Sequence, residues 1–182
     1  LALLDKGVGV DLRDCDGRTA LHLANGRGQT EVGLALVDRG ANVNIPANDG
    51  STALMIASHQ GNVVMVMKLL GNGADTNLST NGECMTVLHL VALEGNVDLA
   101  PVLIERGANV NARTKNNITA LMHASEIGCS SLIQLLLRTG ADASVQSTRA
   151  YTALYIASAC GHLDIVQELI AHGVDLNTTD TK

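Results

Sequence analysis

The chain repeats one short pattern at intervals of 33 or 34 residues. Each copy begins with a threonine followed by a small or branched residue and leucine, and the threonines are Thr19, Thr52, Thr86, Thr119 and Thr152. A glycine keeps the same interval about twenty residues later, at Gly7, Gly40, Gly73, Gly107, Gly140 and Gly173. Two series locked to one period define a repeat protein, in which each layer packs only on its neighbours.

The composition agrees with thin stacked layers. Of the 182 residues 46% are hydrophobic, yet tryptophan and phenylalanine are absent and only two tyrosines occur. A globule of this size normally fills its centre with large aromatic side chains, whereas thin layers pack with leucine, valine, isoleucine and alanine. The sequence therefore predicts a layered fold.

One repeat can be divided into a turn and two helices. Around Asp14–Gly17 the residues are typical of the tip of a β-hairpin-like finger, because glycine adopts positive φ without strain. Thr19 is placed to cap a first helix, and Gly28 to end it in the left-handed region. A second helix then runs to Gly40.

The sequences TALHLA at 19–24 and GANVN at 40–44 resemble the signature of the ankyrin repeat family. The resemblance implies an all-α ankyrin repeat solenoid, a single domain over residues 1–182, made of stacked helix-turn-helix layers with β-hairpin-like fingers. It gives a partial repeat at 1–13, full repeats at 14–46, 47–79, 80–113, 114–146 and 147–179, and the start of another finger at 180–182. Since both ends fall within a repeat, we expect a piece of a longer array.

The third repeat departs most from the pattern. It has one extra residue around Thr80, Cys84 stands where the turn glycine is expected, and Pro101 falls inside the second helix. An interior proline removes a hydrogen bond and opposes the carbonyl four residues earlier, at Val97, although the cost is smaller near a helix start. These departures are interpreted either as tolerated drift or as a bend that shapes a binding surface.

Charge and cysteine usage exclude several classes of partner. The net charge is −6 with no basic stripe, so no nucleic-acid partner is expected. No apolar run reaches the roughly 20 residues of a membrane span, so no membrane insertion is expected either.

The four cysteines lack CxxC spacing, which favours reduced thiols and an intracellular, cytoplasmic location.

No catalytic residue, cofactor or metal site is predicted. The six histidines lack the spacing of a zinc site, and no nucleophile elbow or phosphate-binding glycine loop is present. Asp14 and Asp16 begin like a calcium loop, but Asn25 holds the twelfth position, where a glutamate is required. The resemblance implies that His22 and His89 hydrogen-bond to finger backbone. Outside that pattern, His123 is expected to be half-buried and His162 exposed.

The resemblance also implies a binding face, formed by finger tips and the exposed side of the first helices. On this face the last three repeats place an apolar stripe with a charged rim: Met85, Leu93, Ile118, Ile127 and Tyr151, and Arg113, Lys115, Glu126 and Arg149. Such a stripe favours a protein or peptide partner, bound by a chain that is monomeric or part of a longer one. Alternatively, the stripe packs on neighbouring fingers and the chain is a spacer or scaffold in a channel, adaptor or effector.

A modification is implied by the same resemblance. Ankyrin arrays are frequent substrates of an asparaginyl hydroxylase that prefers leucine eight residues before, and an acid two residues before, the target. Asn77 and Asn177 fit that pattern.

Overall fold

The computed structural model describes residues 9–174, and the structural statements below concern that range. Ten α-helices and no strand lie within it, which confirms the all-α prediction. Residues 1–8, 175–179 and 180–182, which include parts of the predicted first and last repeats, lie outside it. The chain divides into two compact units, Leu1–Gly82 and Glu83–Lys182, which are described separately.

Unit 1 contains two helix pairs. The first pair is α1 (Ala20–Gly26) and α2 (Thr30–Asp38), and the second is α3 (Ala53–His59) and α4 (Val63–Gly71). α1 contacts α3 and α2 contacts α4, so first helices pack on first helices and second helices on second helices. Leu21, Leu54 and Leu69 are at most 1% exposed and fill the space between the layers.

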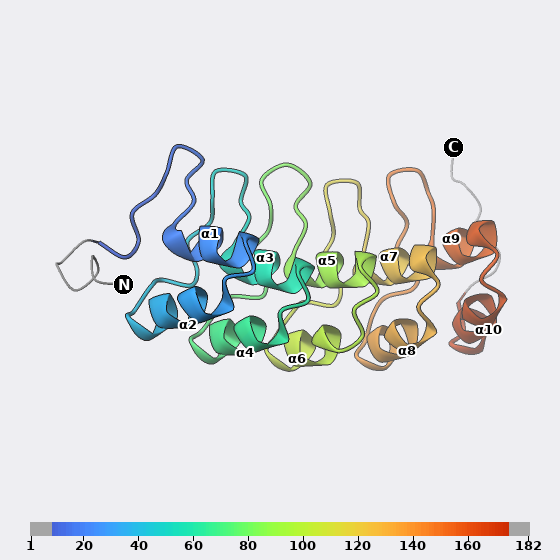
Figure 1. The fold of residues 1–182 in the computed structure, drawn as a ribbon. Coiled ribbons are helices and arrows are strands. Elements are labelled where there is room, and N and C mark those ends of the chain that lie inside the picture. The colour runs from blue at the N-terminus through green and yellow to red at the C-terminus, as the bar shows by residue number, and fades with distance from the viewer. Residues whose placement is uncertain (1–8, 175–182) are drawn as a thin grey trace. The chain divides into compact units, whose positions relative to one another are not determined.

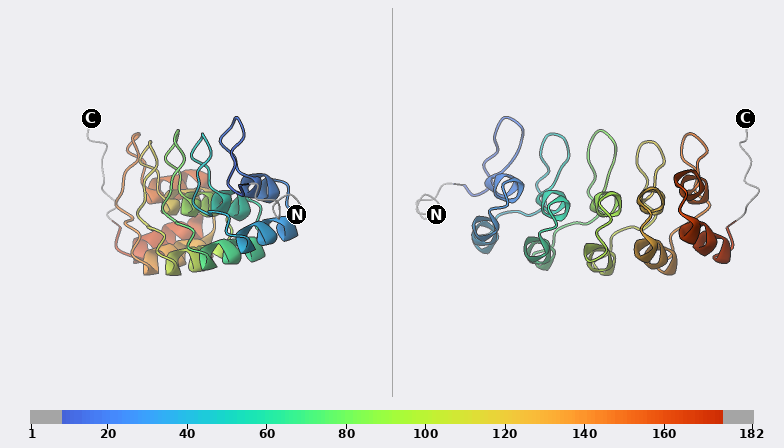
Figure 2. Two further views of the ribbon diagram at one scale, coloured as in Figure 1. Left: turned by 90° about the vertical axis from the view of Figure 1, so that its left-hand side faces the viewer. Right: turned by 45° about the vertical axis from the view of Figure 1, so that its right-hand side comes forward.

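Unit 2 contains three helix pairs. They are α5 (Val87–Leu93) with α6 (Leu99–Glu105), α7 (Ala120–Ile127) with α8 (Ser130–Arg138), and α9 (Ala153–Cys160) with α10 (Leu163–Ala171). First helices pack on first helices here too, and α8 packs on α10. α7 is central, since it contacts α5, α8 and α9. In each unit the fingers extend from the first helices, on the side away from the second helices (Figures 1 and 2).

The threonines begin the first helices as predicted. The hydroxyl of Thr52 accepts a hydrogen bond from the Met55 N–H at 3.3 Å, and Thr119 and Thr152 make the corresponding bond. At Thr19 the histidine three residues later contributes instead, because the Thr19 N–H donates to His22 Nδ1 at 3.2 Å. Each cap satisfies a donor that the first helical turn leaves without a partner.

Glycines with positive φ join the two helices of each pair, as the sequence predicted: Gly28, Gly61, Gly95, Gly128 and Gly161. Of these five glycines, Gly128 leaves the least room for a side chain, because a Cβ there would lie 2.5 Å from His162 Cε1. His162 was predicted to be exposed, and this is wrong. Its ring is half-buried against Gly128, and its Nε2 lies 3.1 Å from the Glu126 carbonyl oxygen.

Backbone hydrogen bonds close each finger and connect successive finger tips within a unit. In the first finger Asp14 N–H donates to the Arg18 carbonyl, and Gly17 N–H donates to the Asp14 carbonyl, both at 2.9 Å. Between tips, one N–H donates to a carbonyl of the preceding finger in four places: Asn48 to Asp16, Asn81 to Asp49, Lys115 to Glu83 and Thr148 to Asn116. We call these four bonds the finger ladder.

Three fingers place a residue other than glycine in the left-handed region. Cys84, Asn117 and Ala150 have φ of 58°, 59° and 61°, at the position that Gly17 and Gly50 hold in unit 1. The sequence pattern singled out Cys84 alone. A side chain at positive φ crowds the neighbouring carbonyl, so these three tips carry backbone strain, least for asparagine.

Pro101 lies inside the second helix of its repeat, as predicted, but the predicted loss of a hydrogen bond to Val97 is wrong. α6 begins at Leu99 and has seven residues, whereas α2, α4, α8 and α10 have nine each. Pro101 is therefore the third residue of its helix, where a backbone N–H has no intrahelical partner in any case. The second helix of this repeat starts two residues late, and no internal hydrogen bond is lost.

Candidate partner-binding surface

A groove of about 410 Å³ lies in unit 2 between the fourth and fifth fingers and the first helices α7 and α9. It is lined by Asn116, Ile118, Glu126, Ser147, Thr148, Arg149, Tyr151, Tyr155, Ile156, Ala159 and Cys160. Of the residues predicted from sequence, four meet here: Ile118, Glu126, Arg149 and Tyr151. We call this surface the unit 2 groove.

The two tyrosines of the chain form one stacked pair in this groove. Their ring centroids are 4.4 Å apart and their planes differ by 10°. Tyr151 ends the fifth finger, and Tyr155 lies four residues later in the first turn of α9, so the cap at Thr152 sets their spacing. Tyr151 is 36% exposed and Tyr155 53%, which leaves a broad aromatic surface open to a partner.

Tyr155 was not among the predicted site residues. It occupies the fourth position of the repeated pattern, where the other repeats place His22, Met55, His89 and Met122, each at most 3% exposed. That position is buried in the other four repeats, and the repeated pattern alone gives no reason to place it in the groove. The residue type could have identified Tyr155 as a candidate, because only this repeat has a tyrosine at the position, whereas the other four have histidine or methionine.

Five predicted residues lie outside the groove lining: Met85, Leu93, Ile127, Arg113 and Lys115. Leu93 and Ile127 are 39% and 47% exposed, at the ends of α5 and α7. Ile127 lies against the preceding inter-helix turn, since its Cγ2 would be 3.5 Å from a Cβ on Gly95. This contact matches the alternative interpretation, in which part of the stripe packs on a neighbouring layer.

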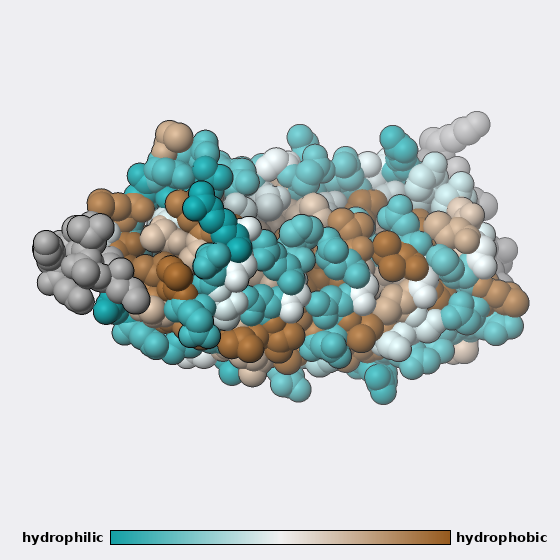
Figure 3. All heavy atoms as spheres, viewed as in Figure 1, coloured by the Kyte–Doolittle hydropathy of each residue, from teal (hydrophilic) through white to brown (hydrophobic). Residues whose placement is uncertain are grey.

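The finger tips beside the groove carry cations. The side chains of Lys115 and Arg149 are exposed, and within residues 9–174 neither cationic group makes a hydrogen bond or an ion pair. Arg113 is held by a long contact of 3.5 Å from Nη1 to Asn117 Oδ1. Hydrophilic residues cover much of the finger edge in Figure 3. Cations are therefore available at the finger edge of the groove.

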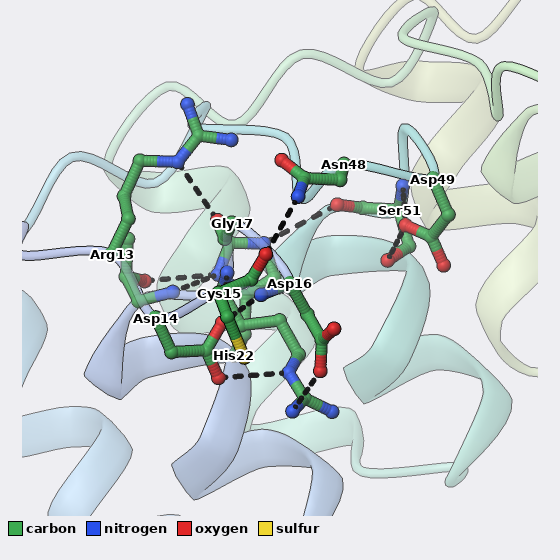
Figure 4. Close-up of polar contacts among 11 residues, drawn as sticks. Arg13, Asp14, Cys15, Asp16, Gly17, His22, Asn48, Asp49 and Ser51 are labelled. Atoms are coloured by element: carbon green, nitrogen blue, oxygen red, sulfur yellow. Dashed lines mark hydrogen bonds and ion pairs between the residues drawn. The ribbon is translucent and has the colours of Figure 1, made fainter.

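The first finger of unit 1 pairs its charged side chains with one another (Figure 4). Arg18 forms ion pairs with Asp14 and Asp16 at 3.1 and 2.6 Å. The Asp14 carboxylate also accepts hydrogen bonds from the Arg18 and Asp16 N–H groups, and the Arg18 backbone bond is the main reason that the pKa of Asp14 is lowered. This is turn chemistry, as predicted for the Asp14–Gly17 segment.

The buried histidines His22 and His89 hydrogen-bond to the next finger, as the family resemblance implies. His22 Nε2 lies 3.3 Å from the Ser51 carbonyl oxygen, and His89 Nε2 lies 3.1 Å from that of Ile118. In both residues Nδ1 accepts from the helix-capping threonine, so the neutral ring with a proton on Nε2 fits both contacts. Burial lowers the pKa of each imidazole.

His123 is half-buried, as predicted, and among the described residues it is the one imidazole whose two ring nitrogens are both buried without a hydrogen bond. Its Nδ1 is 3.9 Å from Glu126 Oε2, too far for a hydrogen bond. Burial lowers the pKa of His123. These two nitrogens lower the stability of unit 2, because each lacks a hydrogen-bond partner in the folded chain.

Of the two residues predicted to be hydroxylated, only Asn77 lies within the described range. Asn77 is exposed, and its backbone N–H donates to the Asp75 carboxylate at 2.8 Å. Asn177 lies outside the described residues. Hydroxylation of either stays a prediction.

Two observations address the broader class of the chain. Among residues 9–174 no helix is long and apolar enough to cross a membrane. No group of three histidine, cysteine, aspartate or glutamate side chains in that range is arranged to hold a metal ion.

Comparison with known families identifies the repeat. A family model described as ankyrin repeats in three copies matches residues 1–80, 59–147 and 88–180. These overlapping matches cover nearly the whole chain. A search of curated proteins gives no match. On the strength of the family match and the stacked helix pairs, this chain belongs to the ankyrin repeat family.

Proposed function

We propose that this chain binds a partner protein through the unit 2 groove and performs no catalysis of its own. Ankyrin repeats are generally protein–protein interaction modules, and the family is typically non-enzymatic. The observation that carries the proposal is the stacked pair of Tyr151 and Tyr155, the only large aromatic side chains of the chain, exposed together in one groove.

A partner seated in the groove would cover the two tyrosine rings and the apolar side chains around them. Tyrosine is enriched at the residues that dominate binding energy, because it presents a large rigid surface and a polar hydroxyl at small entropic cost. Around the pair, Ile118, Ile156 and Ala159 supply apolar surface, while Arg149 and Glu126 supply a polar rim. Truncating either tyrosine to alanine is expected to weaken binding by about 1 to 3 kcal/mol.

The test is a comparative pull-down with identification by mass spectrometry. The bait is the purified chain, compared with Tyr151→Ala, Tyr155→Ala and the control Leu163→Ala, which shortens a 68% exposed side chain that does not line the groove. We expect at least one protein that is retained by the wild type and the control and lost from both tyrosine variants.

The rival role is a spacer or scaffold segment. It is favoured by the regular finger ladder and by the position of Ile127 against the Gly95 turn, which both join neighbouring layers. If the chain is a spacer, all four baits should retain every protein equally. That result would contradict our proposal and favour the spacer role.

We also infer an intracellular location. The cysteines Cys15, Cys84, Cys129 and Cys160 are free thiols, and three of the four are exposed. Exposed free thiols persist in reducing compartments. Fractionation of cells that express the full-length protein tests this, and recovery from the medium would contradict it.

A further inference from the structure

The finger edge of the unit 2 groove differs in charge from the rest of the chain. The tips of the fourth and fifth fingers, residues 114–118 and 147–151, contain Lys115 and Arg149 and no acidic residue. Among the described residues, the one carboxylate bonded to these tips is that of Glu83, which accepts from Asn116 Nδ2 at 3.3 Å. The whole chain has a net charge of −6. In unit 1 the corresponding tips, residues 14–18 and 47–51, contain three aspartates and one arginine, Arg18, which is paired within its own finger.

These cations are not needed by the fold. Lys115 contributes to the finger ladder through its backbone N–H, and Arg149 donates its N–H to Ser147 Oγ at 3.3 Å, so neither uses its charged group. A cation left without a partner at the edge of an apolar groove is suited to meet a carboxylate from outside.

The charge changes sign along the groove. Arg149 lies at a finger tip, and Glu126 lies at the end of α7, close to the inter-helix turn. Ile118 and Tyr151 end their fingers, directly before the helix caps, and Tyr155 lies in the first turn of α9. Along the chain these residues therefore fall between the finger cations and the helix ends. A ligand that fits this order presents acidic groups toward the fingers and an apolar group at the centre.

The size of the groove limits what that ligand can be. A volume of about 410 Å³ accommodates a few side chains, which suits a short extended segment better than the long face of a helix. Extended segments also expose backbone groups that the Thr148 hydroxyl and other polar groups at the tips can bind.

We propose that the unit 2 groove binds an extended, acidic segment of its partner, with a large apolar side chain against Tyr151 and Tyr155 and carboxylates beside Lys115 and Arg149. This rests on the proposed function and specifies the partner's chemistry. The apolar anchor supplies most of the affinity, and the carboxylates set the orientation and the salt dependence.

The test uses a random dodecapeptide library displayed on phage and selected on the purified wild-type chain. We expect the enriched peptides to contain a large apolar residue with aspartate or glutamate next to it. Synthetic copies of these peptides are then measured by fluorescence polarisation at low and at high salt. Affinity is expected to fall about 3- to 10-fold as salt rises, because exposed charge pairs are screened.

Three variants complete the test. Arg149→Glu is expected to weaken these peptides about 10-fold or more, and Tyr155→Ala about 5- to 100-fold. The control Arg27→Glu makes the same change of charge at an exposed position in unit 1 and is expected to leave the affinity unchanged. Enrichment of neutral or basic peptides, no enrichment at all, or equal binding by Arg149→Glu and wild type would each overturn the acidic-segment proposal.

The two proposals fail in different ways. If a protein is lost from the tyrosine variants in the pull-down but its contacting segment is not acidic, the partner-binding function stands and the acidic preference falls. If no protein depends on the tyrosines, both proposals fall.

Discussion

The imidazole rings of His89 and His123 meet edge to face in unit 2, with their centroids 6.1 Å apart. His89 comes from α5 and His123 from α7, so the contact joins two successive first helices. Both residues also reach the groove lining. His89 Nε2 bonds the Ile118 carbonyl, and His123 lies one turn before Glu126. The contact therefore links the packing of two first helices to residues of the groove.

The free energy of unfolding is expected to decrease as the pH falls below 6.5. The pKa values of His22, His89 and His123 are lowered in the folded chain from an ordinary value of 6.5, chiefly by burial. Below that pH the unfolded chain binds protons that the folded chain does not, so stability is full above it and is lost as the pH drops. The slope is at most about 1.4 kcal/mol per pH unit for each histidine.

Urea unfolding at about pH 7.5 and about pH 5.5 measures this effect. The pKa values of Asp14, Asp49, Asp142 and Asp164 are lowered from 3.8, so these carboxylates lose their contribution only at lower pH. Equal free energies of unfolding at the two pH values would contradict the prediction.

Replacement of His123 by leucine is expected to stabilise the chain. Leucine occupies the same position in two other repeats, as Leu23 and Leu90, and it removes two nitrogens that have no hydrogen-bond partner. The gain at neutral pH is expected to be about 1 to 2 kcal/mol, measured by urea unfolding.

The matched comparison is His89→Leu, which removes an imidazole whose two nitrogens are both bonded. This variant is expected to lose about 1 to 3 kcal/mol, because the Thr86 N–H and the Ile118 carbonyl lose their partner. A His123→Leu variant that is as destabilised as His89→Leu would show that His123 is satisfied in solution.

Glycine at position 150 is expected to raise stability. Ala150 has φ of 61°, where a Cβ is unfavourable, whereas glycine adopts that region freely. Part of the gain is offset by the greater freedom of glycine in the unfolded chain, so the net gain is about 0.5 to 1 kcal/mol. Thermal and urea unfolding of Ala150→Gly measure it, and a loss of stability would show that the finger is not strained there.

The opposite substitution in unit 1 is expected to be costly. Gly50 has φ of 83°, and a Cβ there would lie 2.6 Å from the backbone nitrogen of Asn81. That nitrogen donates to the Asp49 carbonyl in the finger ladder, so the added Cβ would disturb a backbone hydrogen bond. Gly50→Ala is expected to cost about 2 to 4 kcal/mol of unfolding free energy. A loss below that of an exposed substitution such as Arg27→Ala would contradict it.

Much of the fold could be predicted because stacking enforces the period. The threonine caps and the inter-helix glycines recur because each helix must begin and end at the same repeat position as the helix that it packs against in the neighbouring layer. Pro101 was misjudged for the same reason. The regular pattern placed the start of its helix two residues too early, and proline was free to move that start because the first turn does not need its N–H.

The candidate site was predicted only in part, because sequence position does not say which exposed residues meet. Ile118, Glu126, Arg149 and Tyr151 lie together since adjacent layers bring the fourth and fifth fingers beside α7 and α9. No prediction was made for Tyr155 from the sequence. In α1 and α5 the residue at this position, His22 or His89, bonds to the following finger, whereas the residues after 174 lie outside the described range.

The finger ladder has a consequence for how such chains change length. Asn48 donates to the preceding finger and Asp49 accepts from the next finger, and these two residues are adjacent. In the third finger the corresponding residues are Asn81 and Glu83, so the extra residue, Gly82, lies at the tip between the donor and the acceptor, and both bonds persist. Insertions in related sequences should therefore be tolerated between the donor and the acceptor of a finger tip, where the chain can lengthen while both bonds of the finger ladder stay in place.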